Sequence, residues 1–326
     1  MDRRGRSART ATPTEAEPSP EWGAPIFLIG MGRSGSTRIF EAMACHPELG
    51  FFSARQDQLP RLPLYSLWTR LWIDRPKLWR HERPAGEPGH WWEHLQDRPS
   101  EGYRIWEACC GAPFRDEFLL GQSAGEAERR AIQRFSRCVL RYQGRQRLLA
   151  KFTGPPRITY LRSLFPHPTF VHVVRDPRAV VPSLLAAPFW KRRGGKEGPA
   201  WRGGFRPEDR EDCERHGWNP VAVAAVHWRR VTETVHCEGR NLPPGQLVEL
   251  RYEDFVREPA QVLKGLWRGC GLAPADSGRA LAGSAIRNRN PSGSSRLGPR
   301  EREIVDALTR TQRQRYGYAD AEPSAS

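Results

Sequence analysis

One short stretch constrains the fold of this chain more than any other. Residues 26–43 read IFLIGMGRSGSTRIFEAM, and the apolar run at 26–29 has the pattern of a buried strand. A loop rich in small residues follows up to Gly35, and apolar residues then recur at helical spacing beyond Thr37. This order predicts a phosphate-binding loop, because the N–H groups of a glycine-rich turn and of a helix N-terminus both favour an anion.

The loop differs from the nucleoside triphosphate motif G-x-x-x-x-G-K-[ST] at one position. Gly30, Gly35 and Thr37 match the motif, but Ser36 stands where the lysine belongs, and the cation comes earlier, at Arg33. We therefore expect an anion other than a magnesium-bound triphosphate. The alternative is a tight strand–helix turn that binds nothing.

A second segment repeats the strand–turn–helix pattern. Residues 169–174 predict another buried strand, followed by Arg175-Asp176-Pro177-Arg178 and then a helix. Proline suits the first position of a helix, where its missing N–H has no partner to lose. Arg175 closes the strand and Ser183 lies in the helix, so both are predicted to reach one phosphate. The alternative is a surface Arg–Asp pair beside a helix cap.

These two segments resemble the nucleotide-binding motifs of sulfotransferases that use 3′-phosphoadenosine 5′-phosphosulfate (PAPS). Residues 33–37 match the family's [KR]-[ST]-G-[ST]-T, and residues 175–183 match R-[DN]-P-[RK]-x-x-x-x-S. Residues 248–255 are similar to the family's Y-E-D segment, and the resemblance covers roughly 25–318. The chain resembles tyrosylprotein and Golgi-type members more than cytosolic ones, because Lys151-Phe152-Thr153 stands where the latter carry Lys-Thr-His.

The resemblance implies a P-loop-like sulfotransferase fold, PAPS as co-substrate, 3′-phosphoadenosine 5′-phosphate (PAP) as product, and no required metal. It also implies that Arg33 and Lys151 meet the charge that develops during sulfuryl transfer, and that the nucleotide is bound by nine residues: Arg33, Ser34, Gly35, Ser36, Thr37, Arg38, Arg175, Ser183 and Tyr252.

The general base is the least constrained position. Cytosolic members use a histidine that corresponds to Thr153, and Golgi-type members use a glutamate from the segment after the first helix, here 48–57. We take Asp57 as the first candidate and Glu107, which follows an aromatic residue, as the second.

Alternating strands and helices predict an α/β fold, with a mainly parallel central sheet and helices on both faces. Helices are expected at 126–142, 158–165, 220–237, 259–269 and 301–314, with further strands at 148–152 and 248–250. Residues 1–23 are interpreted as a disordered polar leader, 24–318 as a single domain, 188–219 as a mobile insertion that is a loop over 194–219, and 319–326 as a tail.

Composition narrows the functional classes. The net charge is +15, but the cations are scattered and no nucleic-acid-binding module is recognisable, so we expect anion binding and a solvated basic surface. No apolar stretch is long enough to predict a transmembrane helix. Seven cysteines without C-x-x-C spacing favour neither a disulfide scaffold nor a zinc site, and indicate the cytoplasm. The twelve tryptophans predict core and lid packing or an aromatic acceptor wall.

The expected reaction moves a sulfuryl group from PAPS to a hydroxyl or amine of a small-molecule, carbohydrate or lipid acceptor. Two alternatives remain open. One is a degenerate P-loop nucleotide kinase, with Asp176 as the magnesium ligand. The other is a non-catalytic protein that binds PAPS or a polyanion.

Overall fold

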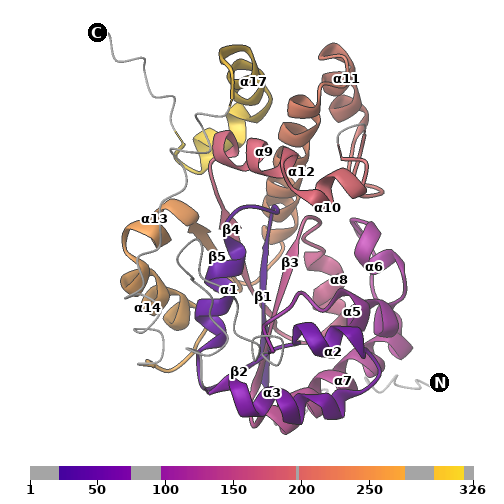
Figure 1. Ribbon diagram of the computed structural model, residues 1–326, viewed down its shortest axis with the longest axis vertical. Helices are drawn as coiled ribbons and strands as arrows, with labels where there is room; N and C mark the ends of the chain where they lie inside the picture. Colours follow the sequence, from indigo (N-terminus) through magenta and orange to yellow (C-terminus); the bar gives the residue numbers. More distant parts are fainter. Residues whose placement is uncertain (1–21, 75–96, 196–197, 276–296, 319–326) are drawn as a thin grey trace, which may run out of the picture.

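The computed structural model describes residues 22–74, 97–195, 198–275 and 297–318 (Figure 1). Its centre is a five-stranded sheet in which every pairing is parallel, in the order β2-β3-β1-β4-β5. The strands are β1 (Gly23–Gly30), β2 (Leu49–Gly50), β3 (Arg147–Thr153), β4 (Thr169–Val174) and β5 (Leu247–Arg251).

Helices surround this sheet. They are α1 (Ser36–Ala44), α2 (Ala54–Gln58), the 3-10 turn η1 (Pro63–Tyr65), α3 (Ser66–Ile73), α5 (Tyr103–Cys110), α6 (Pro113–Asp116), α7 (Glu126–Gln143), α8 (Ile158–Leu164), α9 (Pro177–Leu185), α10 (Pro188–Arg192), α11 (Pro207–Arg215), α12 (Pro220–Gly239), α13 (Tyr252–Arg257), α14 (Pro259–Gly269) and α17 (Pro299–Arg315). The helices and strands expected from the sequence are confirmed.

Both faces of β1 are buried, which explains its continuous apolar run. Ile26 and Leu28 pack toward α1 and α14, and Phe27 and Ile29 pack among residues of α5, α7 and α8. Successive side chains of a strand point to opposite faces, so one run serves both layers. The predicted parallel sheet with helices on both faces is therefore confirmed.

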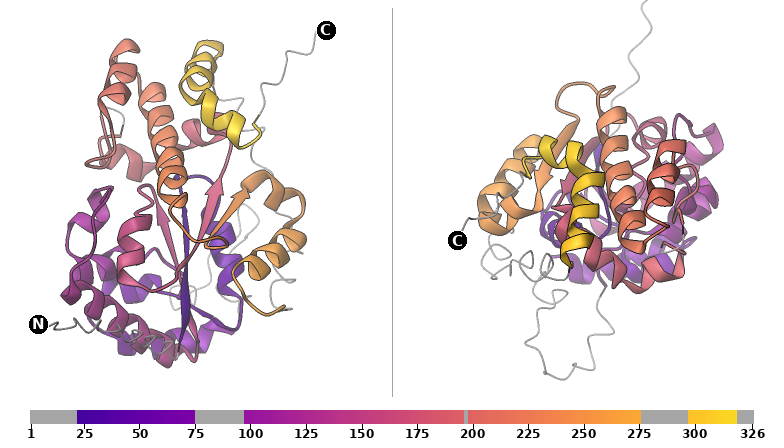
Figure 2. Two further views of the ribbon diagram at one scale, coloured as in Figure 1. Left: turned by 180° about the vertical axis from the view of Figure 1, so that it is seen from behind. Right: turned by 90° about the horizontal axis from the view of Figure 1, so that it is seen from above.

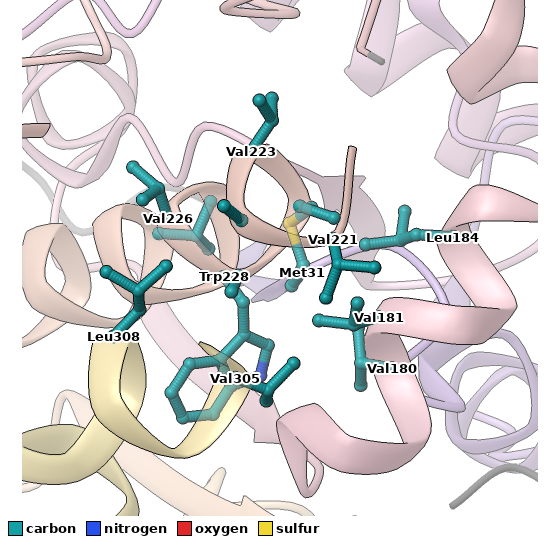
Figure 3. Packing of buried hydrophobic residues seen from close by; sticks show 14 of the residues in the cluster. Met31, Val180, Val181, Leu184, Val221, Val223, Val226, Trp228, Val305 and Leu308 are labelled. Atoms are coloured by element: carbon teal, nitrogen blue, oxygen red, sulfur yellow. The ribbon is translucent and has the colours of Figure 1, made fainter. Parts of the chain in front are cut away.

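A third cluster of buried residues lies beyond the carboxyl ends of the strands. Figure 2 shows α12 and α17 side by side there, and Figure 3 shows valines and leucines of α9, α12 and α17 close to Met31 and Trp228. The indole Nε1 of Trp228 donates a hydrogen bond to the backbone oxygen of Arg175, 3.1 Å away. This cluster therefore holds the end of β4 in place.

The predicted insertion packs against this cluster. The interpretation of 194–219 as a loop is wrong for Pro207–Arg215, which form α11, and Trp190 and Trp201 are buried. Asp209 of α11 pairs with Arg229 and Arg230 of α12, at 2.7 and 3.0 Å. A charge-rich segment thus forms a helix because its charges are paired by a helix that follows in the sequence. The mobility of the insertion stays a prediction.

Two sequence interpretations fall largely outside the described residues. The polar leader, apart from Trp22 and Gly23, and the tail at 319–326 are not described. Among the helices of the described ranges, none is both long and apolar enough to cross a bilayer.

The buried imidazole of His227 makes stability depend on pH. Its Nε2 accepts from the N–H of Ala200 at 2.9 Å, its Nδ1 lies 2.8 Å from the oxygen of Val223, and burial lowers its pKa to about 4. The unfolded chain therefore binds more protons between pH 4 and the ordinary value of 6.5. Stability is expected to fall by up to about 3 kcal/mol as the pH drops through this window.

Urea unfolding of the wild type and of His227→Gln, from pH 7 to pH 4, tests this expectation. The variant should be less stable at pH 7 but lose less stability on acidification. His216→Gln is the control and should follow the wild type. If the free energy of unfolding changed equally with pH in the wild type and in His227→Gln, the role assigned to His227 would be wrong.

Candidate active site

The loop between β1 and α1 has the geometry of an anion cradle. Arg33 and Gly35 have left-handed backbones, with φ of 71° and 80°. Gly35 is the N-cap of α1, no side chain caps the helix, and no acidic residue lies in its first turn. The positive end of the helix is therefore left for a ligand, because its first N–H groups have no partner within the helix.

The side chains of the loop divide into a buried and an exposed set. Ser34 is fully buried, and its hydroxyl Oγ has no hydrogen-bond partner; Ser36 is also buried, whereas Arg33 and Thr37 are exposed. A buried hydroxyl without a partner is uncommon and needs an explanation. An oxyanion bound in the loop would supply the missing acceptor, so these residues fit a phosphate or sulfate group.

Strand β3 brings Lys151 to this loop. Leu28 of β1 is in register with Lys151, whose side chain is buried. The ammonium Nζ donates to Oγ1 of Thr37 at 2.9 Å and lies 3.1 Å from the carboxylate of Glu101. The lysine is therefore held beside the first turn of α1, between the loop and an acidic residue.

Arg175 and Tyr252 close the loop from the other side. The guanidinium of Arg175, which follows β4, lies 4.6 Å from the centre of the Tyr252 ring and donates to the backbone oxygen of Arg33 at 3.2 Å. Burial lowers the pKa of Arg175 from its ordinary value. Arginine is not deprotonated in proteins, so the side chain stays charged. The Tyr252 ring in turn lies directly against Gly35, where a Cβ would come within 2.2 Å of it.

A second hydrogen bond joins the two sequence motifs, besides the one from Arg175 to the backbone of Arg33. The Nε of Arg33 donates to the hydroxyl of Ser183, in α9, at 2.9 Å. The loop after β1 and the segment after β4 therefore form one site at the carboxyl edge of the sheet. Ligands of open α/β folds bind at such an edge, where the strand order reverses direction.

Two arginines near the loop have acidic partners. Arg38 of α1 forms an ion pair with Glu41 at 3.5 Å, and Arg178 forms two hydrogen bonds, of 2.7 and 2.6 Å, with Asp306 of α17. Arg38 therefore lies on α1, the helix that begins at the loop, as its predicted contact requires. Arg178, the second basic residue of the R-D-P-R motif, holds α17 against α9.

The two carboxylates predicted as bases have partners outside the loop. Asp57 Oδ1 accepts from the N–H groups of Arg104 and Ile105, at 2.8 and 3.4 Å, so it caps the first turn of α5. Glu107 is 2.9 Å from Arg115 of α6. Desolvation raises the pKa of both carboxyl groups. Both carboxylates therefore make contacts that stabilise the structure around α5.

Glu101 is the acidic residue that the structure places beside Lys151. Its carboxylate also accepts from the hydroxyl of Thr153, at 3.0 and 3.1 Å, and its side chain is 23% exposed. Lys151 and Thr153 are two positions apart on β3 and so share one face. Glu101 carries no sequence signal, because neither a motif nor a spacing connects it with β3.

The carboxylate considered for magnesium is part of a helix cap. Oδ1 of Asp176 accepts from the N–H of Arg178 at 2.8 Å, and burial raises the pKa of this carboxyl group. In the ranges that the structure describes, no group of three or more His, Cys, Asp or Glu side chains is placed to hold a metal ion.

Comparison with known proteins assigns the family. The model of the family described as "Sulfotransferase family" matches residues 25–276. This match covers most of the chain, which therefore belongs to the sulfotransferase family and is a transferase. The resemblance seen in the sequence motifs is confirmed.

Relatives and solved structures agree with this family. The chain is 29% identical, over 315 residues, to the omega-hydroxy-beta-dihydromenaquinone-9 sulfotransferase Stf3 of Mycobacterium bovis, in an alignment that covers 90% of this chain and 75% of the relative. It resembles the sulfotransferase STF9 from Mycobacterium avium, with a TM-score of 0.54 at 15% identity, covering 94% of this chain and 79% of that one. The sulfotransferase domain from the curacin biosynthetic pathway gives a TM-score of 0.50 at 14% identity, with coverages of 91% and 98%. These two structures show the shared fold.

A substitution at Gly35 tests the geometry of the loop. Gly35→Ala should cost more stability than Gly121→Ala, because both positions have left-handed backbones but only the Cβ at Gly35 meets a ring, while nothing lies within 4 Å at Gly121. We expect about 1–2 kcal/mol at Gly121. The contact with Tyr252 should add about 1–3 kcal/mol at Gly35. Denaturant unfolding measures both, and equal losses would contradict the contact.

Proposed function

We propose that this chain transfers a sulfuryl group from PAPS to a hydroxyl or amine of a small-molecule, carbohydrate or lipid acceptor and releases PAP. The observation that carries the proposal is the hydrogen bond between Arg33 and Ser183. It joins the two segments that the family uses for the 5′- and 3′-phosphate groups. PAPS supplies the activated sulfuryl group, and the residues of this chain bind it, orient it and accept the proton of the acceptor.

The nucleotide half of the site comprises the loop and the residues that close it. The backbone at 34–37 and the guanidinium of Arg33 suit the 5′-phosphosulfate, and Arg175 with Ser183 suits the 3′-phosphate, since charge-assisted hydrogen bonds are the strong kind. Arg38 is proposed to assist from α1. Tyr252 holds Gly35 and Arg175 in place and would border the adenine.

The catalytic half centres on Lys151. Its buried ammonium lies beside Thr37, at the point where α1 begins. A fixed positive charge in a water-poor position stabilises the negative charge that develops on the oxygens of the transferring group and of the leaving phosphate. Arg33 would act on the same charge from the exposed side of the loop.

Glu101 is the base that the contacts favour. It lies next to Lys151, it accepts from Thr153, where cytosolic members carry their histidine, and it is partly exposed. A general base must come within hydrogen-bond reach of the acceptor. Asp57 and Glu107 remain candidates, but their carboxylates already serve the α5 region.

The acceptor class and the location rest on separate observations. The relative Stf3 is named for an omega-hydroxy-beta-dihydromenaquinone-9, so a hydroxylated lipid is the first acceptor to test. All seven cysteines are free thiols, which favours a reducing compartment such as the cytoplasm.

The proposed 3′-phosphate contact predicts the nucleotide preference. PAP should bind at least about tenfold more tightly than AMP, because a hydrogen bond to a charged group contributes roughly 1.5–3 kcal/mol. Arg175→Ala should abolish the preference. Arg251→Ala removes an arginine that stacks in the same way on Tyr318, 4.6 Å from its ring centre, and should leave the preference intact.

Calorimetry measures these affinities, and equal binding of PAP and AMP by the wild type would overturn the assignment of the second motif. Turnover of labelled PAPS in the presence of EDTA would argue against both alternative functions, the nucleotide kinase and the non-catalytic binding protein. A kinase would need Mg²⁺, and a binding protein would show no turnover.

Substitutions in the catalytic half separate chemistry from binding. Lys151→Ala should lower kcat by roughly a hundredfold or more. It should change the affinity for PAP little, since PAP lacks the sulfuryl group. Glu101→Gln keeps the size of the side chain and should lower kcat by about 10²–10⁴ without loss of PAP binding.

Asp57→Asn and Glu107→Gln are the matched controls and should retain turnover. Loss of turnover in Asp57→Asn, with unchanged thermal stability and with Glu101→Gln active, would transfer the role of base to Asp57. Arg33→Ala should impair both kcat and PAP binding, because Arg33 serves both halves of the site.

A further inference from the structure

Helix α3 is amphipathic in the reverse of the usual sense. Ser66, Thr69 and Ile73 lie on its buried face, whereas Leu67 and Leu71 lie on its outer face and are 47% and 56% exposed. A surface helix normally turns its apolar stripe toward the core and its polar residues toward solvent. This helix places leucines outside and two hydroxyl side chains inside.

The polar side chains on the inner face of α3 form hydrogen bonds with other parts of the protein. The hydroxyl of Ser66 accepts from Nε2 of Gln56 at 2.8 Å, and the hydroxyl of Thr69 donates to the carboxylate of Asp97 at 2.7 Å. All four side chains are at most 1% exposed. The helix is thus held on the protein by this polar network and by Ile73 and Trp72, which pack into the core, and its leucines are not needed for that attachment.

The outer leucines belong to a larger set of exposed leucines in neighbouring elements of the chain, here called the leucine surface. It consists of five leucines of α2, η1, α3 and their connections, which are between 43% and 58% exposed: Leu59, Leu62, Leu64, Leu67 and Leu71. Single exposed leucines are ordinary, but a cluster of this kind marks an interaction surface.

The segment that carries the leucine surface has a net positive charge, with three arginines against two aspartates. Residues 54–74 contain no lysine or glutamate, and the exposed Arg61 and Arg70 lie among the leucines. The two aspartates have partners: Asp57 caps α5, and Asp74 forms an ion pair with Arg145. Segments that lie in the interfacial region of a membrane are commonly rich in leucine, tryptophan and arginine, as this segment is.

The leucine surface lies away from the phosphate loop. The Arg70 guanidinium is next to Gly144, and Arg145 pairs with Asp74, so α3 ends beside the turn that leads into β3. Figure 1 shows α3 at the base of the sheet, opposite the loop after β1. A partner bound to α3 would therefore leave the carboxyl edge open for the nucleotide.

We propose that the leucine surface docks the protein on an anionic lipid bilayer, with the leucines in the headgroup region and Arg61 and Arg70 against lipid phosphates. A second copy of the chain fits less well, because a two-fold contact would bring two surfaces of the same positive net charge together. The proposal is independent of the proposed function.

Cosedimentation of the full chain with vesicles tests the proposal. The wild type should bind vesicles of phosphatidylcholine and phosphatidylglycerol more tightly than vesicles of phosphatidylcholine alone. Leu67→Ser/Leu71→Ser should weaken binding by about tenfold or more, since two apolar side chains no longer enter the interface. Leu120→Ser changes an exposed leucine outside the surface and is the matched control, which should bind as the wild type does.

The charge contribution has its own variant. Arg61→Gln/Arg70→Gln should reduce the preference for anionic vesicles by about fivefold per arginine while leaving binding to neutral vesicles unchanged. Affinity for PAP and thermal stability, measured on every variant, should stay at the wild-type level. A failure of the membrane proposal is thereby distinguished from a failure of the proposed function.

Three results would overturn the proposal. The first is a wild type that does not bind anionic vesicles. The second is equal binding by the wild type and the double leucine variant, with or without a change in thermal stability. The third is a wild-type dimer that the leucine substitutions convert to a monomer without any effect of vesicles, which would assign the surface to contacts between copies of the chain.

Discussion

The parallel register of β1 between β3 and β4 is the constraint on which the site depends. Leu28 is paired with Lys151 on one side and with Val171 on the other. Strands in this register end at a common edge, so the loop after β1, the end of β3 and Arg175 come together there. A shift of one residue would turn the alternating side chains of β1 to the wrong faces, and both faces are buried. The hydrophobic core therefore also secures the geometry of the site.

The loop between β1 and α1 is held in shape by side chains of the protein itself. The ring of Tyr252 fills the space beside Gly35, the guanidinium of Arg175 covers that ring, and Arg33 reaches Ser183. Trp228 fixes the backbone of Arg175 from the core beneath. A site held in this way loses little conformational freedom on binding, which favours affinity and directs the N–H groups to where charge is to be stabilised. The buried hydroxyl of Ser34 has no hydrogen-bond partner in this arrangement, and a bound anion would provide one.

Different parts of the fold carry different chemistry. In the proposed site, Arg33, Arg175 and Ser183 form the nucleotide half, and Lys151 of β3 with the neighbouring Glu101 forms the catalytic half. The leucine surface lies at the other end of the sheet, on a helix whose polar residues face inward. Apart from Arg33, which is proposed to serve both halves of the site, these groups share few partners, so substitutions in one are expected to leave the others intact.

The sequence by itself determined four of the five strands, the two motifs of the proposed nucleotide site and the family, because these depend on residues close together in the chain. The contact of Asp57 with α5 and the position of Glu101 beside Lys151 were decided by the tertiary structure, since each joins segments far apart in sequence. Glu107 instead pairs with Arg115 across the short turn between α5 and α6. Tertiary packing also decided α11, whose acidic residues pair with α12, and the outward leucines of α3. Periodicity shows that a helix has two faces, but only packing decides which of them meets the protein.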